Sequence, residues 1–249
     1  MNMAFYTGVS GMVSYQKGID NIANNMANVQ TPGFKVQRAS FADTLRTQLD
    51  VKSNKNELTG HGVKHTKNDL IYTQGSLQYT NRTLDFAIEG DGFFKLQEPN
   101  GEYSYTRAGN FNISVEGGRD YLISNDGSYV LDTRGQKIEV PKSKSDSSNG
   151  SNVLDYSAVA EKIGVYTFDN PFELMPVGDL KLKQTDLSGE NKLVGKDSGY
   201  KLIQGAYENS TTDVASEMTH LIETQKAYQF SAKIVQTSDQ IEEIVNTLR

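Results

Sequence analysis

The chain has no cysteine, only five prolines in 249 residues and no concentration of basic residues. Without cysteine, disulfides, thiolate metal ligands and cysteine nucleophiles are all excluded. The net charge of −6 argues against nucleic acid as a partner, because phosphate binding needs a concentrated basic surface. No stretch is apolar enough to span a bilayer, and residues 1–7 lack the basic start of a cleaved signal peptide. We therefore expect no membrane insertion, and either a cytosolic protein or export by a route without a cleaved signal.

Catalytic patterns are missing as well. There are three histidines, and His61 and His65 have a ligand-like spacing, but Gly60 and Gly62 disfavour the helix that this spacing needs. The segment 90–92, Gly-Asp-Gly, is more typical of a β-turn than of a phosphate-binding loop. No nucleophile elbow or acid/base carboxylate pair is recognisable. The sequence predicts no catalytic residue, no cofactor and no metal site, and hence a protein that is not an enzyme.

The two ends of the chain carry the strongest pattern, which is that of long amphipathic helices. Apolar residues recur at steps of three and four, and this predicts the seam of a helix pair. The C-terminal helix is expected to be continuous and roughly 50 Å long. Two interpretations stay open, an intramolecular helical hairpin and an intermolecular assembly. The predicted self-assembly interface comprises Phe5, Val9, Met12, Tyr15, Ile19, Ile22, Met26, Val29, Val214, Met218, Leu221, Tyr228, Ala232, Val235, Ile241, Val245 and Leu248.

The end of the first helix is predicted near residue 30, because Pro32 disfavours helix at Thr31 and Gly33 supplies a turn. Asparagine is a poor helix former, yet four asparagines precede this end at helical spacing. Their amides are either solvated in a fraying turn or hydrogen-bonded across a packed helix interface, and we favour the second interpretation. The four are Asn21, Asn24, Asn25 and Asn28.

The middle of the chain is predicted to be β-structure. From Leu84 to Tyr207, short alternating runs recur between glycine- and asparagine-rich turns, as in an antiparallel all-β domain. The preceding stretch is expected to be an extended connector with a short helix around Phe41–Leu49 and a strand around Leu70–Tyr79. Thr212 or Asp213 is expected to cap the last helix. The predicted fold class is α+β, with residues 1–34 and 208–249 as a helical axial domain, 35–83 as the connector and 84–207 as a β-rich outer domain.

Three segments resemble flagellar basal-body rod and hook proteins. The N-terminal segment runs from Ile22 through Asn24, Asn25 and Asn28 to Thr31, Pro32, Gly33, Phe34 and Lys35. The second runs from Leu84 to Phe94 and continues with residues 105–111, Tyr-Thr-Arg-Ala-Gly-Asn-Phe. The third lies in the last helix and includes residues 225–228, Gln-Lys-Ala-Tyr. Together they span nearly the whole chain in the family's order.

The resemblance implies a structural subunit of the basal-body rod. Its terminal helices would form the inner tube of a helical homo-oligomer that transmits torque between motor and hook. Its partners would be other rod and hook subunits and the flagellar export apparatus, and it would be exported without a cleaved signal peptide. Residues 43–75 resemble the connector of the distal type of rod subunit. The alternatives are a proximal-rod relative, a hook subunit, a monomeric adaptor and a cell-wall-associated enzyme.

Overall fold

The computed structural model describes residues 3–49, 57–141, 157–195 and 199–248. It contains an N-terminal helix, antiparallel sheets and a C-terminal helix, which confirms the predicted α+β class. The chain forms two compact units. Residues 1–29, 36–71 and 212–249 make one, called here the helical unit, and residues 30–35 and 72–211 make the other, the β unit.

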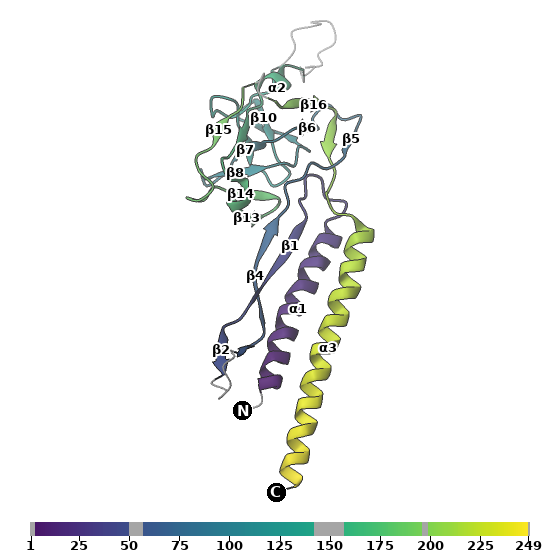
Figure 1. Ribbon diagram of the computed structural model, residues 1–249. Helices are drawn as coiled ribbons and strands as arrows, with labels where there is room; N and C mark the ends of the chain where they lie inside the picture. Colours follow the sequence, from purple (N-terminus) through teal and green to yellow (C-terminus); the bar gives the residue numbers. More distant parts are fainter. Residues whose placement is uncertain (1–2, 50–56, 142–156, 196–198, 249) are drawn as a thin grey trace, which may run out of the picture. The chain divides into compact units, whose positions relative to one another are not determined.

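The helical unit is built on two antiparallel helices, α1 (Met3–Ala27) and α3 (Val214–Thr247) (Figure 1). α1 ends at the predicted place, with turns at residues 28–30 before Pro32. α3 is continuous, as expected, and at about 1.5 Å per residue is roughly 51 Å long. Asp213 caps it, because its side chain accepts a hydrogen bond from the Ala215 amide at 3.1 Å. Within the described chain, neither of these helices is apolar enough over a sufficient length to cross a membrane.

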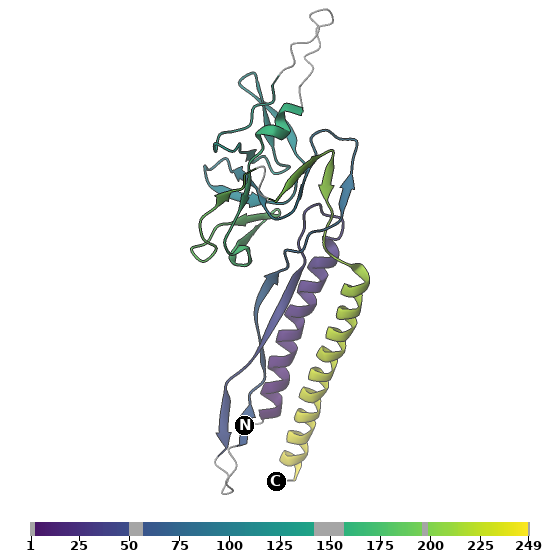
Figure 2. The ribbon, with the colours of Figure 1, turned by 45° about the horizontal axis from the view of Figure 1, so that its top comes forward.

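A β-hairpin lies along α1 and completes the helical unit (Figure 2). Strand β1 (Gln37–Asp43) pairs with β4 (Val63–Leu70), and β2 (Arg46–Leu49) pairs with β3 (Glu57–Gly60). The predicted short helix around Phe41–Leu49 is therefore wrong. Both parts of that segment pair with strands at least eight residues further along the chain, and such partners are not visible in a local pattern.

The β unit contains most of the predicted strands. Its largest sheet has the order β13-β14-β8-β7-β11-β10-β9, and β12 pairs with both β7 and β15. The strands are β7 (Phe93–Gln97), β8 (Tyr103–Thr106), β9 (Asn112–Glu116), β10 (Arg119–Ile123), β11 (Tyr129–Val130), β12 (Val165–Thr167), β13 (Met175–Gly178), β14 (Lys181–Lys183) and β15 (Lys192–Leu193). The strands of this sheet pair in antiparallel fashion, in agreement with the prediction from the turn spacing.

Two further antiparallel pairs join the early and late parts of the β unit. Strand β6 (Phe86–Glu89) pairs with β16 (Lys201–Gln204), and β5 (Leu77–Tyr79) pairs with β17 (Ala206–Glu208). A short helix α2 (Ser157–Lys162) and a 3-10 turn at Pro171–Glu173 connect the later strands. The apolar side chains behind the sheet are almost fully buried and form one core: Phe86, Ile88, Phe94, Leu96, Phe111, Leu122, Val130, Ile138, Val140, Val159, Ile163 and Val165.

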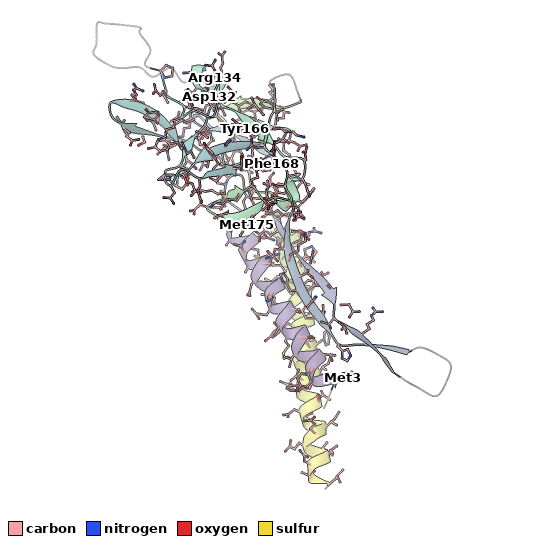
Figure 3. All side chains as sticks on the ribbon, turned by 90° about the vertical axis from the view of Figure 1, so that its left-hand side faces the viewer. Met3, Asp132, Arg134, Tyr166, Phe168 and Met175 are labelled. Carbon is pink, nitrogen blue, oxygen red and sulfur yellow. The ribbon has the colours of Figure 1, made fainter. Side chains whose placement is uncertain are left out.

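Aromatic rings extend this packing on the other side of β7 and β8. The ring of Phe168 lies edge-on to Tyr105, with centroids 4.7 Å apart, and it is 6.1 Å from the ring of Phe93. Tyr166 and Phe168 come from the segment that follows α2 (Figure 3). Apolar groups thus pack against both faces of these central strands.

Candidate assembly surface

Small residues form the line along which α1 and α3 approach each other. A Cβ added at Gly8 would lie 2.8 Å from Val235 Cγ2, and one added at Gly11 would lie 2.9 Å from Ser231 Oγ. A Cβ at Gly18 would meet Thr224 at 3.3 Å. On α3 the contact line follows residues seven apart, namely Glu217, Thr224, Ser231 and Ser238, which are buried or half-buried. Small side chains on both helices therefore set the close packing of the pair.

The predicted apolar stripe lies mainly beside this contact line. Only Ile22 among its members is buried. Tyr15 and Val235 are half-buried at the edge of the contact line, and Val29 lies in the turn after α1. Ten members are half-buried or exposed and follow one flank of each helix. We call this surface the broad face: Phe5, Val9, Met12, Ile19 and Met26 from α1, with Val214, Met218, Leu221, Tyr228 and Ala232 from α3.

A second apolar surface lies on the opposite flank of α3. We call it the α3 strip; its members Phe230, Ile234, Ile241, Val245 and Leu248 expose between 49% and 82% of their surface. Three of them, Ile241, Val245 and Leu248, belong to the predicted stripe. A groove of about 480 Å³ opens on this flank, between Ala4 and residues 230–241 of α3.

The last two turns of α3 extend beyond the start of α1. Gly8 faces residues 231–235, and Asn25 contacts Glu217, so in this antiparallel register Met3 lies near residue 239. Figure 3 shows α3 continuing past the labelled Met3. Ile244, Val245 and Leu248 are exposed in this extension, which has no partner helix among the described residues of the protomer.

The asparagine cluster divides into two pairs. Asn25 Nδ2 donates to Glu217 Oε2 at 3.2 Å and to the Gln37 carbonyl at 2.8 Å, and Asn25 Oδ1 accepts from the Gln37 amide at 3.0 Å. Asn21 Nδ2 donates to the same carbonyl at 3.1 Å. The predicted hydrogen bond across the helix interface is confirmed for Asn25. Asn24 is exposed, and Asn28 Nδ2 donates back to it within the same segment.

The Thr-Pro-Gly-Phe motif lies at the start of the β unit. Gly33 has a φ of +72°, and a Cβ there would come within 2.6 Å of the Ala108 amide nitrogen. Its own amide donates to the Glu208 carbonyl at 2.7 Å. Phe34 is buried, and its carbonyl accepts from the Thr211 amide at 3.1 Å. Glycine is thus required both by the left-handed backbone and by the close approach of the backbone at Arg107 and Ala108.

A buried ion cluster holds this part of the β unit together. Glu208 accepts hydrogen bonds from Lys35 Nζ at 2.6 Å, from Arg107 Nη1 at 3.1 Å and from the Gly75 amide at 2.7 Å. The three ionic side chains are at most 6% exposed. Lys35 also donates to the Thr73 carbonyl, and Arg107 donates to the carbonyls of Gly90 and Gly92. Burial lowers the pKa of Lys35, although the neighbouring Glu208 carboxylate opposes that effect.

Sequence reasoning missed two carboxylates that organise these contacts. Lys35 and Arg107 both lie in the recognised motifs, but their partner Glu208 is 173 and 101 residues away from them. Glu217, the partner of Asn25, is 192 residues away from it. One signal was available, because Glu217 and Asn25 both lie within family segments. No local spacing links the members of either pair.

An apolar surface along a helix pair, in a chain whose β unit has a core of its own, is typical of a structural assembly protein. Three family models match the chain: "Flagella basal body rod protein" over residues 5–35, "Flagellar hook protein FlgE/F/G D1 domain" over 87–156, and "Flagellar basal body rod FlgEFG protein C-terminal" over 203–248. The chain belongs to the flagellar basal-body rod protein family.

Curated relatives match along the full length. The chain is 35% identical to "Flagellar basal-body rod protein FlgG" of Borreliella burgdorferi, covering 100% of this chain and 99% of the relative. It is 32% identical to the protein of the same name in Bacillus subtilis, with 100% of both chains covered. It is also 27% identical to "Flagellar hook-basal body complex protein FlhP" of Bacillus subtilis, again over both full lengths. The protein is thus a structural rod subunit of the flagellar basal body, and not an enzyme.

Proposed function

We propose that this subunit assembles with further copies of itself, and with other rod and hook subunits, into the axial tube that transmits torque between motor and hook. The observation that carries the proposal is the apolar surface of the helical unit. Fully burying an exposed large apolar side chain contributes about 1.5–3 kcal/mol gross, so nine such side chains on the broad face, several of them already half-buried, favour a protein partner over water.

We further propose that the terminal helices form only on assembly. The two helices bury few large apolar side chains against each other, since the contact line consists of glycine, serine and threonine together with Glu217. Ordering each backbone residue costs about 1–2 kcal/mol, and this cost offsets much of what the isolated pair gains. An unfolded terminal segment also suits passage through the flagellar export apparatus, which we propose as the route out of the cell.

Within the rod we propose the distal position. Two observations support it: the connector at residues 43–75 resembles that of distal subunits, and the FlgG relatives match over the full length. For the tube we propose the predicted division, with residues 1–34 and 208–249 axial, 35–83 connecting and 84–207 outside. The compact units differ from it in that residues 36–71 pack with the helices, and residues 30–35 and 208–211 belong to the β unit.

The experiment replaces Leu221, a half-buried member of the broad face, with aspartate. A charge there would be desolvated in any packed interface, so Leu221→Asp is expected to abolish incorporation while the β unit stays folded. The matched control is Gln240→Asp, at an exposed position of α3 facing away from α1. Incorporation is measured by quantitative mass spectrometry of purified hook and basal-body particles. Normal copy numbers of Leu221→Asp would refute the assignment of the broad face.

A further inference from the structure

The apolar side of α3 changes flank along the helix. With about 100° between successive residues, Val214, Leu221, Tyr228 and Ala232 lie on one side of the contact line that faces α1. Phe230, Ile234, Ile241, Val245 and Leu248 lie on the other side, and past Ala232 the first flank continues with Asp239 and Glu243. One helix therefore presents two apolar surfaces that face away from each other, each covering about half of its length.

The first of these surfaces continues onto α1. Each helix has two flanks, one on either side of the contact line. In an antiparallel pair, the two flanks that are reached by turning in the same sense about each helix axis, viewed along its own chain direction, lie on the same side of the pair. The first flank of α3 meets this condition together with five residues of α1, and they form the single broad face. The five residues are Phe5, Val9, Met12, Ile19 and Met26. The α3 strip lies on the opposite side of the pair, next to the groove at Ala4.

We infer that the α3 strip of one copy packs on the broad face of the next copy, in a head-to-tail contact. The inference rests on the proposed self-assembly and specifies how it occurs. The two surfaces lie on opposite sides of the helix pair, so one copy can contact two neighbours at once, one through each surface. A contact between two different surfaces leaves one of each unoccupied after every addition, and such contacts generate open helical filaments.

The positions of the two surfaces also set the axial offset. Neighbours in such a filament point the same way, so their α3 helices are parallel. The strip is centred near residue 239, and the broad face is centred near the level of residue 226 of α3. This difference of about 13 residues corresponds to an axial displacement of roughly 20 Å between neighbouring copies. Ile241 of one copy then lies beside Tyr228 of the next.

The absence of cysteine allows a direct cross-linking test in the full chain. The double variant Ile241→Cys/Tyr228→Cys is incorporated into basal bodies and treated with a short bis-maleimide. Within one helix these positions are roughly 20 Å apart and on opposite flanks, so a short linker cannot join them in the same copy. We expect a ladder of covalent multimers extending beyond the dimer.

Three controls separate the outcomes. Each single cysteine variant is expected to give no cross-link, and so is the pair Ile241→Cys/Lys226→Cys, because Lys226 is exposed on the side of α3 that faces away from the broad face. Dimers from Ile241→Cys alone would show a two-fold contact and overturn the head-to-tail inference. Incorporation of the double variant without a ladder would overturn it too. Absence of the unmodified chain from the particles would instead refute the proposed rod assembly itself.

Discussion

Replacing Glu208 by glutamine tests the buried ion cluster with almost no change of shape. In the native β unit its carboxylate offsets two buried cations, with 2.6 Å to Lys35 Nζ and 3.1 Å to Arg107 Nη1. A glutamine oxygen can still accept from the Gly75 amide, but the variant has no negative charge. Its amide group also directs N–H donors toward side chains that only donate.

The expected loss of stability is large because the carboxyl side chain of Glu208 is only 1% exposed. Removing one partner of a buried ion pair costs about 3–5 kcal/mol, since the opposite charge stays buried without compensation. For a unit of this size, that loss lowers the melting temperature by roughly 10 °C. Arg107 cannot release its proton, so it carries most of this cost.

Lys35 makes the loss of unfolding free energy in Glu208→Gln depend on pH. Its folded pKa lies below the unfolded value of 10.5, so the folded state releases this proton first and its stability gains as pH rises toward 10.5. Without Glu208, neutral Lys35 becomes still more favourable. The difference in stability between wild type and Glu208→Gln should therefore shrink as the pH is raised from 7 toward 10.5.

The assay is urea denaturation of the full chain, followed by tyrosine fluorescence and near-UV circular dichroism, at several pH values. The matched control is Glu102→Gln, which breaks the exposed pair between Glu102 and Lys183 and should leave the midpoint unchanged. A Glu208→Gln midpoint that coincides with wild type at pH 7 would show that the cluster contributes nothing to the fold and would refute the reasoning.

Three further changes probe other contacts. Asn25→Ala removes three hydrogen bonds and should destabilise the helical unit by about 2–3 kcal/mol, seen as faster amide exchange in assembled particles, whereas the exposed Asn24→Ala should have little effect. Gly8→Leu should separate α1 from α3 and reduce incorporation, and normal incorporation would contradict the close packing. Burial raises the pKa of Tyr105 to about 12, so its stabilising contribution is complete below pH 10 and is lost between about pH 10 and 12. Phenylalanine has no hydroxyl to ionise, so between pH 10 and 12 Tyr105→Phe should lose roughly 2–3 kcal/mol less unfolding free energy than the wild type does. Urea denaturation at several pH values in this range measures the difference.

Local patterns predicted the helix ends and most strands because the interactions that fix them are local. Pro32 and Gly33 end α1 whatever surrounds them, and Asp213 caps α3 through an amide two residues away. In the β unit, turn residues separate short alternating runs whose partners are often the next strand along the chain, as in β9–β10 and β7–β8. The hairpin β1–β4 was missed, because its strands pair across about 20 residues and are themselves mostly polar, without a strong apolar alternation.

The sequence by itself determined that both ends are amphipathic helices, that the middle is antiparallel β-structure and that the motifs are those of a rod subunit. These properties follow from periodicity, turn residues and motif identity, all of which are readable along the chain. Only the tertiary structure decided which residues lie between the helices. Gly8 and Ser231 meet there because small side chains permit the closest approach, and the larger apolar residues are displaced to the flanks. Only the structure, likewise, brought Glu208 to Lys35 and Arg107, because charges buried in a folded core must find a partner regardless of their separation in sequence.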